Sequence, residues 1–554
     1  MRARARRLRL VAGLVAVMLL AGTTPAHAAA HEQIQGSGSS WATNAINVWI
    51  AAVTSKGLQV VFTSTGSGQG RKDFGNSTTD YAVSDIGYQG KDPQTGDTDL
   101  PCKLGSSTDC RAYAYLPIVA GGTAFPYHIS VGGQLIRNLR LSGLTLAKIF
   151  TGGITNWNDP AITADNNGRR LPSLPIIPLV HSEASGSSAQ FTTYLDTEYP
   201  SIWRAYNGKG GEAEYYPKAK NMIAQNGSDG VMNYIASGAA NGAIGYDEYS
   251  YALAKNFPVA KVENSAGYYT LPTQFNVAVA LQKAIINENK SSPNYLLQDL
   301  HNVYTFNDKR TYPLSSYSYA IIPTGATDPR VDTAKRQTLA DFLFYSVCEG
   351  QAQIGPVGYS ALPLNLVQAS FEQVGKLKAA DPKVDLTNRS VTSCNNPTFT
   401  KGNLAHNHLA DIAPNPPSCD QAGQGPCAGS GDAGTQFVTS GTTNVSSGTN
   451  GSQNSKNSGS SNNAGAGGNT PSSAASKAAG GSGKTRTVVN PDTGQVQTVS
   501  DAGTGGADVV GQPTELSAYR QQNMTNLLGP LAIGLLFLAL FAPPLAFLRL
   551  RRRK

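Results

Sequence analysis

Three short segments rich in glycine and serine have the composition of an anion-binding site. They are residues 36–41, 65–70 and 183–188, and each stands in front of a predicted amphipathic helix. The first turn of a helix has backbone N–H groups without partners inside the helix, and it carries the positive end of the helix dipole. Small residues let an anion approach this backbone closely, and serine hydroxyls add donors. Three such turns predict a cradle for an anion.

The elements around these turns indicate an α/β domain. Between about residues 33 and 395, stretches typical of strands alternate with stretches typical of helices. We expect strands at 59–63 and 176–180, helices at 40–53 and 188–194 opened by serine caps, and a buried helix face at 341–345. This alternation predicts helices layered on a largely buried sheet. Ligands of such sheets bind at the carboxyl ends of the strands, where the three turns fall.

Both ends of the chain have the pattern of membrane-targeting segments. Residues 1–28 combine five arginines, an apolar run and Ala26-His27-Ala28, which predicts a cleaved signal peptide rather than an uncleaved anchor. Residues 526–548 are apolar enough to cross a bilayer, and the basic residues 549–554 predict a cytoplasmic tail. The expected protein is therefore a single-pass membrane protein with its domain outside the cytoplasm. A secreted protein whose tail is removed is the alternative.

Residues 396–525 are expected to form a disordered extracytoplasmic linker. They are rich in Gly, Ser, Asn and Thr and have few apolar side chains to bury. A linker of this kind holds a folded domain near the membrane without fixing its orientation.

The charge distribution excludes a strongly basic binding surface. The formal net charge is +8, but the two ends carry ten basic residues and no acidic ones, so the rest of the chain carries about −2. We therefore expect no nucleic-acid partner. An anion must be bound by local dipoles and hydrogen bonds.

Six cysteines in an extracytoplasmic chain predict disulfides. Spacing favours Cys102–Cys110 and Cys419–Cys427, which leaves Cys348–Cys394, although six cysteines allow fifteen pairings. The spacings do not match zinc sites, so no metal site is expected.

An ordered set of motifs over about residues 34–377 resembles the substrate-binding proteins of phosphate ABC transporters (the PstS type). The motifs are the first two glycine-rich turns, Tyr81-Ala82-Val83-Ser84-Asp85, the segment 144–150 with Trp157-Asn158-Asp159, residues 226–231, Gly242-Ala243-Ile244-Gly245-Tyr246 and Gly358-Tyr359-Ser360-Ala361-Leu362-Pro363. Each motif is weak alone, and their order and spacing carry the resemblance.

The resemblance implies a two-lobed periplasmic-binding-protein-like (type II) fold with a hinge. The domain would span residues 29–395, with lobe one at 31–118 and 262–395 and lobe two at 119–261. The implied partners are inorganic phosphate or a similar oxyanion and an ABC permease of the membrane. The family members are binding proteins, so neither a cofactor nor catalytic residues are expected.

The resemblance also implies which residues bind the anion. The implied donors are Ser40, the amide of Trp41, Ser67, Ser185, Gly186 and Ser187. Asp85 would accept a hydrogen bond from the ligand. Phosphate carries an O–H that sulfate lacks at neutral pH, so a buried carboxylate can discriminate between them. A helix cap is the alternative role for Asp85.

One position departs from the family pattern. Where the family has an arginine two residues before an acidic residue, this chain has His181 ahead of Glu183. Histidine is only partly charged near neutral pH, whereas arginine is always charged. Arg71 is a candidate replacement cation, with a solvated helix residue as the alternative. His181 is otherwise a structural hydrogen bonder at the rim.

These observations favour a membrane-tethered protein that binds phosphate for ABC-transporter uptake. The alternatives are a binder or sensor of another oxyanion, with affinity set by His181, and a surface protein that reuses the fold. A secreted phosphatase is the least favoured, because no nucleophile elbow or metal-binding signature is present in the sequence.

Overall fold

The computed structural model describes residues 31–91, 98–106, 108–399 and 406–427, together with the backbone of two strands, β20 (Thr485–Val489) and β21 (Val496–Ser500). The chain divides into two units at residue 457, and β20 and β21 pair within the second. The predicted signal peptide, membrane segment and cytoplasmic tail lie outside the described residues. Within the described ranges, no helix has both the length and the apolar character to cross a bilayer.

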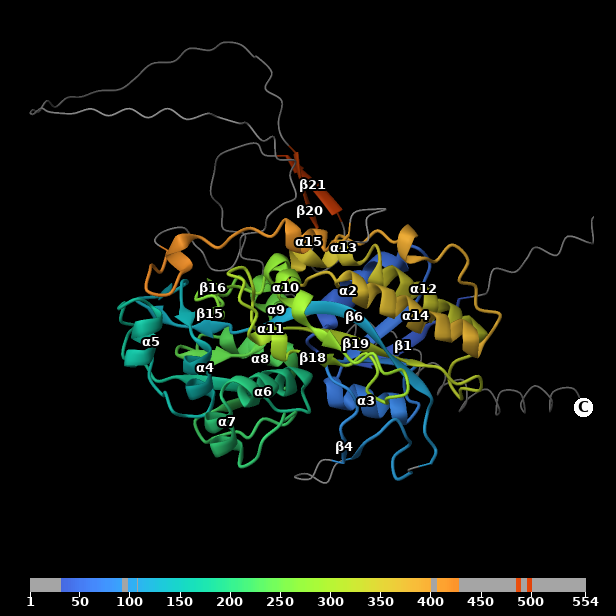
Figure 1. Ribbon diagram of the computed structural model, residues 1–554, viewed down its shortest axis with the longest axis horizontal. Coiled ribbons are helices and arrows are strands. Elements are labelled where there is room, and N and C mark those ends of the chain that lie inside the picture. Colours follow the sequence, from blue (N-terminus) through green and yellow to red (C-terminus); the bar gives the residue numbers. More distant parts are fainter. Residues whose placement is uncertain are drawn as a thin grey trace, which may run out of the picture. The chain divides into compact units, whose positions relative to one another are not determined.

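A six-stranded sheet forms the centre of the first unit (Figure 1). Its order is β14-β6-β19-β3-β1-β2, with β1 parallel to its neighbours and β19 antiparallel to β3 and β6. Every residue of β3 and β19 is buried, as expected for strands covered on both faces. The strands are β1 (Ile34–Gly38), β2 (Val60–Ser64), β3 (Tyr81–Ser84), β6 (Tyr113–Ala124), β14 (Asp247–Glu248) and β19 (Ser315–Pro323).

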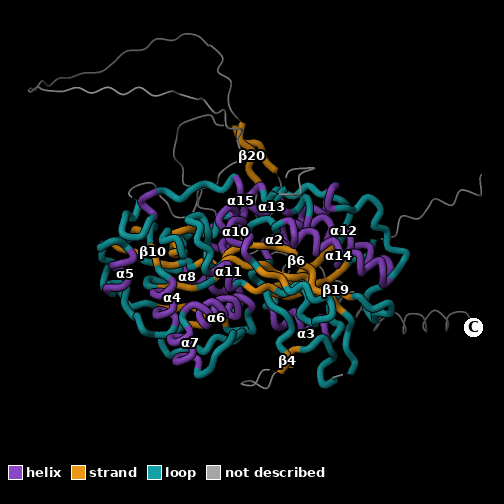
Figure 2. The backbone as a smooth tube through the Cα atoms, viewed as in Figure 1, coloured by secondary structure: helices purple, strands orange, loops and turns teal. Residues whose placement is uncertain are grey.

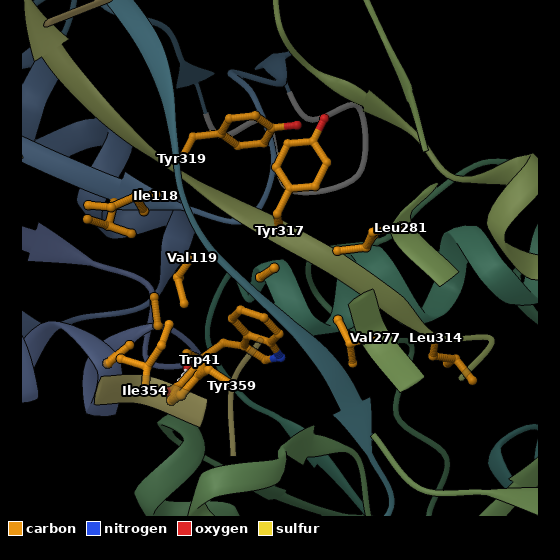
Figure 3. Close-up of a cluster of buried hydrophobic side chains, with 14 of the residues drawn as sticks. Trp41, Ile118, Val119, Val277, Leu281, Leu314, Tyr317, Tyr319, Ile354 and Tyr359 are labelled. Atoms are coloured by element: carbon orange, nitrogen blue, oxygen red, sulfur yellow. Dashed lines mark hydrogen bonds between the residues drawn. The ribbon is translucent and has the colours of Figure 1, made fainter. Parts of the chain in front are cut away.

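Helices pack on this sheet from several parts of the chain. They are α2 (Thr43–Thr54), α3 (Ser67–Gly75), α10 (Gln274–Ala280), α12 (Thr333–Val347) and α14 (Leu364–Ala380). The interior is aromatic where α2 begins. Figure 3 shows the Trp41 side chain beside Tyr359, and the two rings meet edge to face with their centroids 5.8 Å apart.

A second, four-stranded sheet has the order β12-β11-β13-β7, parallel except for β7. Its strands are β7 (Tyr127–His128), β11 (Ile177–His181), β12 (Ile223–Gln225) and β13 (Ala243–Gly245). The helices of this region, shown in teal and green in Figure 1, are α4 (Gly143–Phe150), α5 (Pro160–Asp165), α6 (Gly186–Glu198), α7 (Pro200–Asn207), α8 (Gly227–Ile235) and α9 (Tyr249–Ala254).

Two strands of the larger sheet continue directly into the smaller one. β6 ends at Ala124 and the chain enters β7 three residues later, while β13 is followed after Tyr246 by β14. β14 pairs antiparallel with the end of β6. The two sheets are therefore joined by neighbouring crossings of the backbone, which is the arrangement that a hinge requires. The predicted residue limits of the two lobes stay a prediction.

The remaining elements are short, and loops connect them (Figure 2). They are β4 (Gly90–Lys91), β5 (Thr98–Asp99), β8 (Ser130–Val131), β9 (Gln134–Leu135), β10 (Arg140–Leu141), β15 (Lys261–Glu263), β16 (Tyr269–Thr270), β17 (Ile285–Ile286), β18 (Gln298–Asp299), α11 (His301–Tyr304), α13 (Gln351–Ile354), α15 (His408–Asp411) and four single 3₁₀ turns, η1 (Leu281–Lys283), η2 (Gly355–Val357), η3 (Val391–Ser393) and η4 (Ser418–Asp420).

The predicted helix starts are partly wrong. α2 begins at Thr43 rather than Ser40, because residues 40–42 form a turn in which the Ser39 hydroxyl accepts the Ala42 amide at 3.2 Å. α6 begins two residues before Ser188, and its cap is Ser185, whose side chain accepts the Ser188 amide. Serine sequences mark a helix start well, but several adjacent serines do not show which one is the cap.

The three disulfides predicted from spacing are present. They join Cys102 to Cys110, Cys348 to Cys394 and Cys419 to Cys427.

Part of the predicted linker is packed against the folded unit. The composition predicts a linker from residue 396 onward, but the segment 406–427 contains α15 and η4. The buried Asp420 carboxylate pairs with Lys261 at 2.8 Å. Leu409 and Ala410 pack in a small apolar cluster with Ala278. A disulfide and a buried ion pair order a segment whose composition alone predicts disorder.

Candidate anion-binding site

The first two glycine-rich turns lie together because their strands are neighbours. Gly38, at the end of β1, pairs with Ser64 at the end of β2 and with Val83 of β3. These parallel strands therefore end at one edge of the sheet. The turn before α2, the start of α3 and Asp85 all follow directly from this edge, as expected for a ligand site in an α/β fold.

Asp85 is a buried carboxylate surrounded by serine hydroxyls. One oxygen, Oδ1, accepts hydrogen bonds from Ser39 at 2.7 Å and from Ser318 at 2.6 Å. The other, Oδ2, accepts from Ser67 at 3.0 Å. No described helix begins at Asp85, so the helix-cap alternative is wrong. The hydroxyls hold the carboxylate in place, and its oxygens have further lone pairs.

Burial raises the pKa of Asp85 above its ordinary value. The hydrogen bonds from Ser318, Ser39 and Ser67 and the charge of Arg71 act in the opposite direction, but the net pKa shift is upward. Without these donors the burial of a charged carboxylate would be far less favourable.

The third turn, at the start of α6, lies against this carboxylate. A Cβ on Gly186 would stand 2.4 Å from Asp85 Oδ2 and 2.6 Å from Ser67 Oγ, so only glycine fits. The Gly186 and Ser187 amides are the first two N–H groups of α6 and have no acceptor inside the helix. The Ser185 hydroxyl oxygen accepts the Ser188 amide, which leaves its proton for another acceptor.

Ser40 and Trp41, in the turn before α2, also lie at this edge of the larger sheet. The Ser40 hydroxyl lies 3.1 Å from both the amide nitrogen and the hydroxyl oxygen of Ser228 at the start of α8. The Trp41 indole is in the core, and its carbonyl accepts the Tyr359 hydroxyl at 2.6 Å. Trp41 can therefore serve an anion only through its backbone amide.

His181 and Glu183 form a pair at the end of β11. His181 Nδ1 lies 2.8 Å from Glu183 Oε1, and both side chains are largely buried. Among the described residues, His181 Nε2 and Glu183 Oε2 have no hydrogen-bond partner. Burial alone would lower the pKa of His181, but the hydrogen bond and charge of Glu183 outweigh it and the net pKa shift is upward. The imidazolium is therefore more stable in this site than in an unperturbed histidine.

A second carboxylate that sequence reasoning missed acts on His181. Asp247 is fully buried, and its Oδ2 has no partner among the described residues. It follows Tyr246, whose ring centroid lies 5.3 Å from that of His181. Burial raises the pKa of Asp247 to about 7, although the charge of His181 opposes the shift.

Arg71 is fully buried, so its alternative as a solvated residue is wrong. Its guanidinium donates from Nε to Asp99 at 2.6 Å and from Nη1 to Ser84 at 2.8 Å. Its Nη2 donates to Glu214. Two carboxylates therefore share its charge. Arg71 lies near Asp85, but its three nitrogens are already paired within the protein.

Sequence reasoning missed several residues that support Asp85. Ser39 lies inside the first turn, where adjacent serines look alike. Ser318 lies on β19, more than two hundred residues away, and nothing in its local sequence marks it. The Asp85 carbonyl also accepts from Gln190 of α6 at 2.9 Å. In the part of the chain that the structure describes, no cluster of side chains is suited to hold a metal ion.

Comparisons with known proteins agree on one family. The family described as the PBP superfamily domain matches residues 23–349. Phosphate-binding protein PstS 2 of Mycobacterium tuberculosis is 30% identical over 61% of this chain and 85% of its own length. Phosphate-binding protein PstS 3 of Mycobacterium leprae is 30% identical over 60% of this chain and 83% of its own.

A phosphate-binding protein from Stenotrophomonas maltophilia has a TM-score of 0.45 and 17% identity, covering 61% of this chain and 93% of that one. The family assignment rests on the sequence relatives, which are named as binding proteins and not as enzymes. This chain belongs to the PstS-type family of phosphate ABC-transporter substrate-binding proteins, within the PBP superfamily.

Proposed function

We propose that this protein binds inorganic phosphate between its two lobes and delivers it to an ABC permease. The observation that carries the proposal is that the buried Asp85 carboxylate lies where the three turns at residues 36–41, 65–70 and 183–188 meet. We call these the donor turns. The names of the relatives support the same ligand.

The proposed donors come from both sides of the cleft. From the larger sheet we assign the Ser40 hydroxyl, the Trp41 amide and the Ser67 hydroxyl. From α6 we assign Ser185, Gly186 and Ser187. Amides at a helix start can bind an anion without a positively charged side chain, because their unpaired N–H groups point along the helix axis.

Asp85 would read the proton of the ligand. Both monohydrogen and dihydrogen phosphate have an O–H that can donate to the carboxylate, whereas sulfate at neutral pH has none. A buried acceptor left without a donor is costly, and two buried negative groups in contact repel. Selectivity for phosphate over sulfate follows from this one contact.

The proposed location is outside the cytoplasmic membrane, with the chain tethered by residues 526–548. PstS-type proteins work outside the cytoplasm, and the three disulfides suit an oxidising compartment. The support for the signal peptide at 1–28, the tether and the basic tail is the sequence pattern alone, since these residues lie outside the described ranges.

Calorimetric titration of the full chain in detergent with phosphate tests the proposal, with sulfate as the matched anion. We expect saturable heat with phosphate and none with sulfate at the same concentration. Tryptophan fluorescence, to which Trp41 contributes, gives a second readout. The absence of any response at millimolar phosphate would overturn the proposal.

The His181–Glu183 pair favours a second candidate, which is a binder or sensor of another oxyanion. Arginine binds phosphate with two parallel hydrogen bonds, and a histidine cannot reproduce that geometry. Competition of arsenate, sulfate and phosphate for the same site separates the candidates. Equal or tighter binding of a fully deprotonated anion would favour the second.

A further inference from the structure

A buried group of charges joins the two sides of the cleft beside the donor turns. Arg71 of α3 contacts Asp99 of β5, which belongs to the same side, and Glu214, which lies in the loop after α7 on the other side. Arg71 has no exposed surface, and the Glu214 side chain is only 13% exposed. We call Arg71, Asp99 and Glu214 the latch.

The backbone of Glu214 is fixed to the third donor turn. Its carbonyl accepts the Ser185 amide at 3.1 Å, and Ser185 caps α6. One residue earlier in the same turn, the Ala184 carbonyl accepts the Gly68 amide of α3 at 3.0 Å. Glu214 thus contacts α6 through its backbone and α3 through its carboxylate.

The surfaces around the latch fit closely. A Cβ on Gly68 would stand 2.4 Å from the Ala184 Cβ, and one on Gly66 would stand 2.9 Å from Glu183 Cγ. The starts of α3 and α6 can approach this closely only because both glycines lack side chains. The donor turns that we assign to the anion are therefore held against each other at this contact.

We propose that Glu214 is a positioning residue for anion binding, which holds the α3 and α6 donor turns together by pairing across the cleft with Arg71. The inference rests on the proposed function. It also explains why Arg71 does not replace the arginine that His181 displaces, since its charge is offset by Asp99 and Glu214 within the latch.

Only one arm of the latch has to break when the lobes separate. Asp99 and Ser84 lie on the same side as Arg71 and keep their contacts with it. Glu214 moves away with α6. A cavity of about 110 Å³ lined by Arg71, Lys91, Glu212 and Glu214 borders the pair, so water can reach the two charges as they part.

The sign of this contribution follows from the asymmetry of the latch. Burying an ion pair is costly, but burying one charge without its partner costs more. If Glu214 loses its charge, closure still buries Arg71 against Asp99 but gains no interaction across the cleft. The closed state then loses stability relative to the open state, and a bound anion escapes faster.

The test compares Glu214→Gln with Glu212→Gln in the full chain in detergent. The Glu214→Gln substitution preserves the size of the side chain and removes its charge. Glu212 is the matched control because it lies two residues away in the same loop and feels the charge of Arg71, but its carboxylate accepts from Thr193 of α6 on its own side at 3.3 Å. Stopped-flow fluorescence measures phosphate association and dissociation. Spin labels on the exposed positions Lys56 of the larger-sheet side and Ser201 of α7 measure the lobe separation without ligand.

We expect Glu214→Gln to raise the dissociation rate about 10- to 100-fold, with the association rate changed less than threefold, in line with most affinity effects. The spin-label distances of the ligand-free variant should shift to longer values, while Glu212→Gln stays close to the wild type. Unchanged dissociation and unchanged distances would overturn the proposal. A shift in distance without phosphate binding in any variant would retain the latch and reject the proposed function.

Discussion

The groups around Asp85 and the groups around His181 form two walls of the candidate site. They differ in how completely their charged side chains are hydrogen-bonded. On the larger-sheet side, the Asp85 carboxylate accepts hydrogen bonds from three serine hydroxyls, and its backbone carbonyl accepts one from the Gln190 side chain. Around His181, one polar atom each of His181, Glu183 and Asp247 is buried without a partner among the described residues. Asp247 lies on β14, where the chain returns to the larger sheet. Both oxygens of the Asp85 carboxylate have partners within the protein, whereas His181, Glu183 and Asp247 each keep an unpaired atom.

From this difference we infer separate origins for the selectivity and for the pH dependence of the proposed anion binding. A fully hydrogen-bonded carboxylate keeps one geometry and can test a ligand for a donor. The protonation of the buried His181 imidazole is coupled to the charges of Glu183 and Asp247, so it responds to a further charge nearby. We therefore expect the Asp85 side to distinguish ligands by their O–H group and the His181 side to make binding depend on pH.

Asp85→Asn should have the largest effect, because Asp85 is the carboxylate on which the donor turns meet. It removes an acceptor for the ligand's O–H and turns one donor toward the serines. We expect phosphate affinity to fall by about 3–5 kcal/mol, roughly a hundred- to several-thousandfold. Calorimetry with phosphate and sulfate measures this change. A variant that still prefers phosphate as strongly as the wild type would show that Asp85 does not read the proton.

Asp247→Asn should stabilise the protein at high pH. The raised pKa of Asp247, about 7, means that the folded state binds more protons than the unfolded state between pH about 4 and 7, so this group lowers stability as the pH rises through that window. The amide removes this penalty. Each pKa unit corresponds to about 1.4 kcal/mol, so the gain is at most about 4 kcal/mol at pH 8 and near zero at pH 4.

Denaturant unfolding of Asp247→Asn and wild type at pH 4, 6 and 8 provides the measurement. A stability difference that is the same at all three values would mean that Asp247 does not titrate in the folded protein.

His181→Arg should place a permanent positive charge at the end of β11. The pKa of His181 is raised by Glu183, so the imidazolium persists to a higher pH than in an unperturbed histidine and is lost as the pH rises through that pKa. Wild-type affinity should therefore decline with increasing pH more steeply than that of the arginine variant. The variant should bind about 10- to 100-fold more tightly at pH 8, corresponding to about 1.5–3 kcal/mol.

Calorimetric titrations of both proteins with phosphate from pH 6 to 9 measure this, and ionisation of the ligand affects both equally. Parallel profiles would contradict a role for His181 in the anion site.

Ser318→Ala should have the smallest effect. It removes one of the three hydroxyls on Asp85 and raises the pKa of that carboxyl further, because the Ser318 hydrogen bond lowers it. We expect a loss of about 1 kcal/mol in phosphate affinity, about fivefold. Ser316→Ala, two residues earlier on β19, is the matched control. A loss of phosphate affinity equal to that of Asp85→Asn would mean that Asp85 cannot function without the Ser318 hydroxyl.

The sequence predicted the α/β class, the three disulfides and the placement of the three turns in front of helices because these depend on local patterns. Glycine and serine mark the neighbourhood of a helix start but not its first residue, and short cysteine spacings limit the pairing. It failed where the cause was distant. The packed segment 406–427 depends on Lys261, and the burial of Arg71 depends on Asp99 and Glu214.

The sequence alone places three turns rich in glycine and serine directly after three strands. Which groups surround these turns depends on the tertiary structure. Ser318 reaches Asp85, Asp247 acts on His181 and Glu214 holds Arg71 because the sheet order places distant segments side by side. Burial then makes each contact matter, since a charge without a partner is far costlier inside a protein than in water.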